Sequence, residues 1–193
     1  MKVMNRGLNK GEKDSKVYTP EIIAKRVHQI ITDSGLKTDV IFEPSIGEGF
    51  IVKDFTESKI IGNDIDPKGK NFCDEFYLGD FENFKKSLLK DEVDIVISNP
   101  PFNGHKSRKL YPEVFLRKIV EEFGRDIPIV IIVPHGLRLN QKMKSKRWKW
   151  MNDNLEITSI LSLPVDIFPG VLFHTEIIFF NVPNIKPHYY IEG

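Results

Sequence analysis

The segment Ser98-Asn99-Pro100-Pro101-Phe102 contains the residue types that point most clearly to chemistry. Two successive prolines fix the backbone and remove two N–H donors, so the carbonyl oxygen of Pro100 and the amide oxygen of Asn99 can accept hydrogen bonds from one group. Such a pair suits an amino group on an aromatic ring, whose delocalised lone pair becomes nucleophilic when both hydrogens are held. Phe102 supplies a flat ring on which a flipped nucleobase can stack. The alternative is a rigid turn that caps a buried strand.

The segment from Glu43 to Phe50 reads Glu-Pro-Ser-Ile-Gly-Glu-Gly-Phe and follows a run of Val, Ile and Phe. Its two glycines, Gly47 and Gly49, let the backbone turn sharply and approach a ligand before the next helix begins. An ordinary turn from a strand to a helix explains the same pattern, so this loop needs support from elsewhere in the chain.

Carboxylates at two later strand ends provide that support. Asp64 lies about 20 residues beyond the glycine loop, where an acid can accept both hydroxyls of a ribose. Only one of Asp64 and Asp66 can point inward on a strand, so we assign Asp66 to a turn. Asp80 can accept a hydrogen bond from an adenine amino group while Phe81 packs on the ring, although a helix cap explains Asp80 equally well. These residues predict a nucleoside cofactor.

Short apolar runs alternate with longer amphipathic stretches from Asp39 onward, which predicts a mostly parallel sheet covered by helices. Seven strands are expected, at residues 39–45, 59–66, 75–80, 93–100, 128–134, 156–164 and 174–182. A helix is expected over residues 19–35, with a Thr cap, Pro at the first helical position and an end near Gly35. The loop between the last two strands is too short for a crossover helix, so these strands should pair antiparallel.

The expected fold is therefore α/β and Rossmann-like, a seven-stranded, mostly parallel sheet with one antiparallel strand and helices on both faces. The chain has 193 residues and a formal net charge of +1, which fits one globular domain. We expect residues 1–16 to form a flexible arm and residues 17–193 a single catalytic domain. Cys73 is the single cysteine, so we expect neither a disulfide nor a metal site. Because no apolar run reaches membrane-spanning length and no secretory signal is present, we expect no membrane association and a cytoplasmic location.

Basic character is concentrated between Arg138 and Lys149, where six cationic residues occur without an acidic one. Cations in this segment and directly after Phe102 can reach phosphates on either side of a base held at the catalytic segment. The alternative is a solvated helix face over two buried tryptophans, Trp148 and Trp150. The residues expected to bind nucleic acid are Lys106, Arg108, Lys109, Arg138, Lys142, Lys144, Lys146 and Arg147.

In this order, these motifs resemble the amino-methyltransferases of DNA whose cofactor segment precedes an Asn-Pro-Pro-Phe catalytic segment. The later runs 133–136, 161–164 and 175–180 are similar to the modification subunits of type I restriction systems. The resemblance covers residues 17–182. It implies methyl transfer from S-adenosylmethionine to N6 of adenine in DNA, with S-adenosylhomocysteine as the product and no metal. It also implies catalytic roles for Asn99, Pro100, Pro101 and Phe102, and cofactor contacts from Tyr18, Thr19, Pro20, Glu43, Pro44, Ser45, Gly47, Gly49, Asp64, Ile65, Asp80 and Phe81.

The chain departs from the family pattern in two ways. Glu43 stands where Asp or Asn is common, and either acid could hold the ammonium group of the cofactor. Relatives usually carry a separate target-recognition domain, for which this sequence leaves no residues, so recognition is expected to be relaxed or supplied by a partner subunit. The alternatives are methylation of an RNA base or of a protein glutamine, and a noncatalytic binding subunit or decoy. The resemblance places the protein in a bacterial cytoplasm, or in that of the host of a phage.

Overall fold

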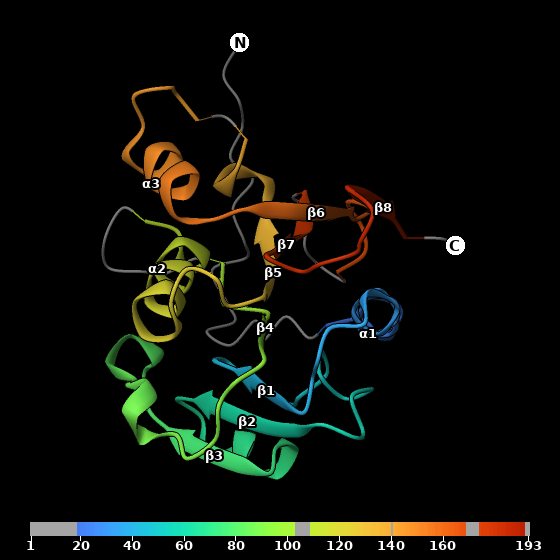
Figure 1. Cartoon of the computed structure of the whole chain (residues 1–193), viewed down its shortest axis with the longest axis vertical. Coiled ribbons are helices and arrows are strands. Elements are labelled where there is room, and N and C mark those ends of the chain that lie inside the picture. The colour runs from blue at the N-terminus through green and yellow to red at the C-terminus, as the bar shows by residue number, and fades with distance from the viewer. Residues whose placement is uncertain (1–18, 103–108, 140, 169–173, 192–193) are drawn as a thin grey trace, which may run out of the picture.

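The computed structural model describes residues 19–102, 109–139, 141–168 and 174–191, so the predicted arm lies outside it. In this part of the chain, eight strands form one sheet in the order β3-β2-β1-β4-β5-β7-β6-β8 (Figure 1). The strands are β1 (Val40–Glu43), β2 (Lys59–Asp64), β3 (Glu75–Leu78), β4 (Ile95–Ser98), β5 (Ile129–Pro134), β6 (Ile157–Ser162), β7 (Thr175–Phe180) and β8 (His188–Tyr190).

Strand β7 is the antiparallel strand of this sheet, because it pairs antiparallel with both β5 and β6 while the other neighbours pair parallel. The predicted antiparallel pairing of the last two strands is thus confirmed for β6 and β7. All seven predicted strands are present, and β8 is an eighth that pairs parallel with β6. Strand β8 has only three residues and follows Pro187, which is why no apolar run indicated it.

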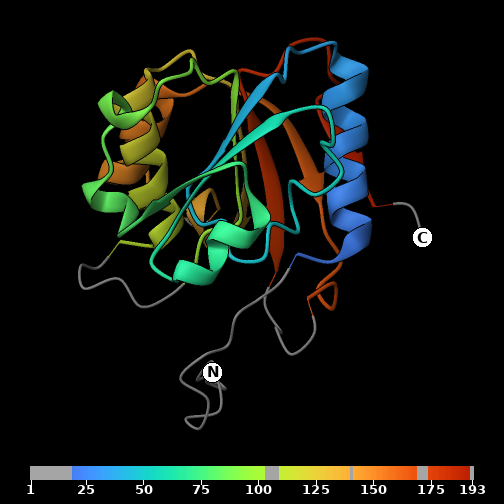
Figure 2. The same ribbon diagram turned by 90° about the horizontal axis from the view of Figure 1, so that it is seen from below.

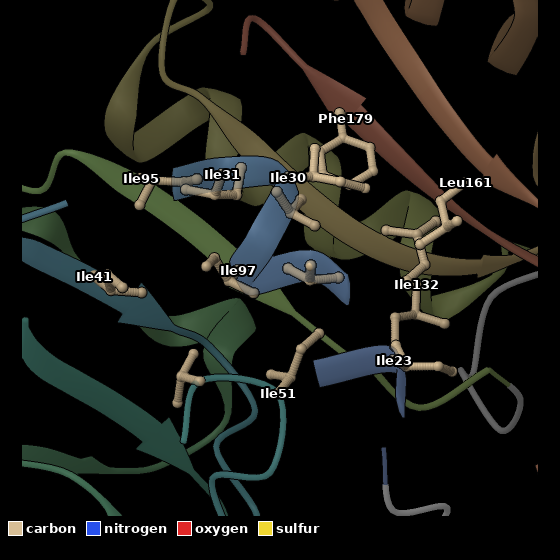
Figure 3. Close-up of a cluster of buried hydrophobic side chains, with 14 of the residues drawn as sticks. Ile23, Ile30, Ile31, Ile41, Ile51, Ile95, Ile97, Ile132, Leu161 and Phe179 are labelled. Carbon is tan, nitrogen blue, oxygen red and sulfur yellow. The ribbon is translucent and has the colours of Figure 1, made fainter. Parts of the chain in front are cut away.

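Helix α1 (Glu21–Ser34) covers one face of the sheet, and its side chains Ile23, Ile30 and Ile31 lie against those of β4, β5 and β7 (Figure 3). The helix ends at Gly35, whose φ of 69° is left-handed and favours glycine. The predicted cap is corrected, because Pro20 occupies the N-cap position and the helix has no side-chain cap. The hydroxyl group of Thr19 is instead paired with the side chain of Asn99.

Helices α2 (Tyr111–Phe123) and α3 (Lys146–Asn154) cover the opposite face, over a second apolar cluster (Figure 2). The prediction of helices on both faces is therefore confirmed. No helix in the described ranges is both long and apolar enough to cross a membrane.

Turns replace the helix that was expected to begin after the glycine loop. Residues 50–58 form successive turns, and Ile51, Val52 and Phe55 are buried directly against the sheet. Short 3-10 turns, Pro67–Phe72, Phe81–Asn83 and Lys86–Leu88, fill the later connections around β3. Packing of loops this close to a strand needs small residues: a Cβ atom on Gly69 would lie 2.7 Å from Cγ2 of Ile46. The glycine loop is therefore held by packing rather than by a following helix.

Candidate active site

The glycine loop and the catalytic segment are in direct contact at the carboxyl ends of the parallel strands. Ser45 follows β1 and Asn99 follows β4, and these strands are neighbours in the sheet. The hydroxyl oxygen of Ser45 lies 3.3 Å from that of Ser98 and 3.4 Å from the backbone oxygen of Asn99, so its single hydrogen can be donated to Asn99 or to Glu43. A ligand held by the first loop would therefore lie beside the acceptors of the second segment.

Glu43 is an acid buried beneath this junction, with 1% of its surface exposed. Its Oε1 accepts hydrogen bonds from the backbone N of Ser45 at 3.0 Å and from the Ser45 hydroxyl at 3.2 Å. Burial raises the pKa of Glu43 to about 8, although the bonds from Ser45 and Ser98 act in the opposite direction. The buried carboxyl group thus favours its neutral form near pH 7, and a positive charge beside it would favour its ionised form.

Asp64 joins the second strand end to the glycine loop. Its Oδ2 accepts a hydrogen bond from the backbone N of Gly47 at 2.8 Å, and its Oδ1 accepts one from Asp66 N at 2.8 Å. Asp66 instead caps the following turn by accepting a bond from Lys68 N at 3.0 Å. The expectation that Asp66 belongs to a turn is confirmed, because β2 ends at Asp64 and Asp66 lies beyond the strand. Gly47 has a φ of 50°, so the loop conformation favours glycine there.

An apolar surface lies beyond the ends of β2 and β3. Ile65 is 75% exposed directly after Asp64, and Leu78, which pairs with Asp64 in the sheet register, is 63% exposed. Exposed aliphatic side chains beside an acid suit the planar base of a nucleoside. Sequence reasoning missed Leu78, although an apolar residue directly before the Gly79 turn was a usable signal.

Asp80 and Phe81 contact other parts of the protein, where the sequence predicted contacts with a ligand. Asp80 accepts a hydrogen bond from Glu82 N at 3.0 Å, so it caps a short helical turn, which was the alternative explanation. Phe81 is 2% exposed and packs among Phe42, Phe84 and Phe115. The expectation that the Phe81 ring packs on adenine is corrected, because this ring is part of the core.

A residue directly before α1 contacts the catalytic segment. Nδ2 of Asn99 donates a hydrogen bond to the hydroxyl oxygen of Thr19 at 3.1 Å. Pro100 is buried, Pro101 is exposed, and Phe102 is 8% exposed within the cluster beneath α1. The expected stacking face of Phe102 is thus covered in this conformation, and stacking of a base would require the ring to turn outward. Tyr18, Lys106 and Arg108 lie outside the described residues.

Two of the predicted nucleic-acid contacts are instead paired with buried acids. Arg138 forms a two-pronged ion pair with Glu176, at 3.0 and 2.8 Å, and Glu176 is 1% exposed. Arg147 donates to Glu113 at 2.6 Å and to the backbone oxygen of Gly136 at 3.0 Å. Both arginines therefore contribute to holding the fold together, and their contact with DNA stays a prediction. Their acidic partners lie too far along the chain for the sequence to indicate them.

Several of the remaining cations in this region line an open groove of about 740 Å³ between α2 and α3, together with the acids Glu113 and Asp153. Its lining includes Lys109, Arg117, Lys146, Lys149 and Trp150. The guanidinium group of Arg117 stacks over the Trp150 ring at 4.2 Å, and Trp150 packs on the second apolar cluster. Trp148 is 46% exposed, so the expectation that the tryptophans are buried is wrong for Trp148. Lys142 and Lys144 are exposed in the segment before α3.

Comparison with known proteins agrees with this architecture. No family model matches the chain. The chain is 26% identical over 108 residues to the methylase subunit of the EcoEI type I restriction enzyme of Escherichia coli, a match that covers 49% of this chain and 22% of that subunit. The type I methyltransferase subunit of Streptococcus thermophilus superposes with a TM-score of 0.72 at 16% identity, over 93% of this chain and 48% of that one. A proposed RNA methyltransferase of Pyrococcus horikoshii superposes with a TM-score of 0.59 at 18% identity, over 89% of this chain and 88% of that one.

The fold is that of the class I S-adenosylmethionine-dependent methyltransferases. Within that class, the chain is similar to the methylase subunits of type I restriction-modification systems. It spans about a fifth of the length of the Escherichia coli subunit and about half that of the Streptococcus thermophilus subunit.

Proposed function

We propose that this protein transfers a methyl group from S-adenosylmethionine to the N6 amino group of adenine in DNA. The observation that carries the proposal is the contact between the glycine loop and the catalytic segment through Ser45 and Asn99. This contact brings a site suited to a charged nucleoside next to two acceptors suited to an aromatic amine. The similarity to type I methylase subunits favours DNA over the other substrates with such an amine.

The residues at the first loop fit the cofactor. Asp64 lies where it can accept from a ribose, Ile65 and Leu78 offer an apolar surface for the adenine base, and Glu43 can balance the positive charge of the methionine part. When bound, S-adenosylmethionine supplies an electrophilic methyl group on a sulfonium, with a neutral thioether as the leaving group. We expect Pro44, Gly47 and Gly49 to shape this loop.

The residues of the catalytic segment act on the target amine. The amide oxygen of Asn99 and the carbonyl oxygen of Pro100 accept its two hydrogens, which localises the nitrogen lone pair for attack on the methyl carbon. As the new N–C bond forms, the methyl–sulfur bond breaks, and the methylated nitrogen then releases one proton to solvent. No acidic or basic side chain is needed for these reaction steps. We therefore expect the loss of Asn99 to lower the rate of methyl transfer more than the loss of any other side chain of the segment.

The DNA strand is proposed to lie along the groove between α2 and α3, with its phosphates near exposed lysines. A base flipped from that strand would enter the catalytic edge beside Pro101. Contacts with phosphates do not read sequence, so we propose that a partner specificity subunit supplies recognition, or that the preference of the protein for a target is short.

Incubation of the pure protein with methyl-labelled cofactor tests this function, with duplex DNA, single-stranded DNA, RNA and a protein extract as separate substrates. We expect label in DNA, recovered as N6-methyladenine after digestion. Label in RNA or in protein alone would replace DNA as the substrate. Cofactor binding without transfer to any of the four would favour a binding subunit.

Two variants assign the roles within the site. Asn99→Ala is expected to abolish transfer while cofactor affinity stays within a few fold, because Asn99 acts on the target amine. Asp64→Ala is expected to weaken cofactor binding, measured by calorimetry, because it removes both the ribose acceptor and the bond to Gly47. Substantial turnover by Asn99→Ala, or tight cofactor binding by Asp64→Ala, would contradict these assignments.

A further inference from the structure

The side-chain amide of Asn99 can face the substrate in two ways. Rotation by half a turn exchanges its oxygen and its NH2 group with almost no change in shape. Only one of these orientations offers an acceptor to the target amine, because the NH2 group would meet it as a second donor. A neighbour that fixes the plane of the amide, and that can accept a hydrogen bond from its NH2 group, leaves the oxygen for the target amine.

Thr19 lies in the position of such a neighbour. Its hydroxyl oxygen is the acceptor for Asn99 Nδ2 at 3.1 Å, and Thr19 is only 5% exposed, so little water competes for this bond. With Nδ2 directed at Thr19, Oδ1 is directed along the other branch of the amide. The main chain of Asn99 has a different neighbour, because its backbone oxygen lies 3.4 Å from the Ser45 hydroxyl oxygen.

Thr19 is itself fixed by the start of α1. The backbone oxygen of the next residue, Pro20, accepts hydrogen bonds from Ile23 at 3.0 Å and from Ala24 at 3.2 Å. Ile23 and Ala24 are fully buried, so the first turn of α1 is packed against the rest of the protein. A rigid, buried hydroxyl is a better guide for an amide than a side chain on a mobile surface loop.

We propose that Thr19 is a positioning residue, whose hydroxyl group fixes the plane of the Asn99 amide and accepts from its NH2 group when Oδ1 faces the target amine. This role rests on the proposed methyl transfer, and it differs from the cofactor contact that the sequence resemblance implied for Thr19. The hydrogen bond between Thr19 and Asn99 supports the positioning role.

A pair of substitutions separates the two roles. Thr19→Val keeps the shape of the side chain but removes the hydroxyl group, whereas Thr19→Ser keeps the hydroxyl group. At saturating cofactor, we expect Thr19→Val to lower the single-turnover rate by roughly 10- to 100-fold, the effect of losing one buried hydrogen bond at the reacting group. Its cofactor affinity should stay within about threefold of wild type, and Thr19→Ser should restore the rate to within about threefold. Weaker cofactor binding by Thr19→Val with an unchanged rate at saturation would overturn the proposal.

A second measurement does not depend on activity. In nitrogen-15 NMR spectra of the protein without ligands, the NH2 signal of Asn99 can be assigned by its loss in Asn99→Ala. We expect its hydrogens to exchange slowly with water in wild type and in Thr19→Ser, and faster in Thr19→Val. Equal exchange in all three proteins would overturn the positioning role. Slow exchange in a protein that methylates none of the four substrates would support the Thr19–Asn99 hydrogen bond and would contradict the proposed function.

Discussion

Glu43 is a residue whose charge depends on whether the chain is folded. Its pKa is about 8 in the folded protein, against an ordinary value of 4.5, because the carboxyl group is buried. Between these two pH values the unfolded chain loses the proton that the folded chain keeps. The contribution of Glu43 to stability is therefore complete below pH 4.5 and is lost as the pH rises toward 8.

Glu43→Gln is expected to remove that loss, because the amide cannot ionise. The measurement is the free energy of unfolding by urea at about pH 5 and at about pH 8, without cofactor, for wild type and variant. Wild type should lose more stability than the variant between the two pH values. Parallel pH profiles would show that Glu43 is already ionised in the folded protein.

The turn Pro67–Phe72, which follows β2, packs closely against the glycine loop that follows β1. A Cβ atom on Gly69 would lie 2.7 Å from Ile46 and 3.0 Å from Phe76, and Ile46 belongs to the glycine loop. Gly69→Ala is therefore expected to cost about 1–3 kcal/mol in unfolding free energy, as other overpacked sites do, and to weaken cofactor binding through the displaced loop. Gly136→Ala is the matched control, because nothing lies within 4 Å of its added Cβ atom. Equal stability of the two variants would contradict the packing argument.

The segment that leads into α3 is the element expected to contact DNA. Arg147 holds Glu113 and must be kept in a test of this surface, whereas Lys142, Lys144 and Lys146 are exposed. Their triple change to Ala should reduce the salt dependence of binding to duplex DNA by roughly one unit of slope for each phosphate that the variant no longer neutralises. The change of three lysines elsewhere, Lys25, Lys53 and Lys186, removes the same charge as a control. A slope that does not change would show that this surface does not touch DNA.

Elements proved easier to predict from the sequence than the surroundings of single side chains. The seven longer strands follow from apolar runs, and the residues after β1, β2 and β4 meet as parallel strands require. Phe81 and Phe102 were misjudged, because an aromatic residue at a strand end looks the same whether it faces a ligand or the core. The roles of Arg138 and Arg147 depend on Glu176 and Glu113, which only the fold brings near. Thr19 was expected to contact the cofactor, and its bond to Asn99 joins two residues with no local pattern in common.

At the level of the whole molecule, β7 connects the two parts of the sheet. It lies between β5 and β6, and its side chains are all buried. It also supplies Glu176, the partner of Arg138. A chain that ends at residue 173 is thus expected to lose cooperative thermal unfolding and to bind apolar dyes, whereas one that ends at Pro183, without β8, should still unfold cooperatively. Cooperative unfolding of the shorter chain would show that β7 is dispensable.

The position of β7 also constrains how the chain can fold while it is being synthesised. Strands β5 and β6 run in the same direction, and α3 joins them in sequence, so together they form a unit that can pair by itself before β7 exists. In the finished sheet these two strands do not touch, because β7 separates them. A nascent chain that pairs β5 with β6 too early must break that pair before β7 can enter. Refolding after full denaturation is therefore expected to contain a slow step in which an already compact intermediate opens its sheet.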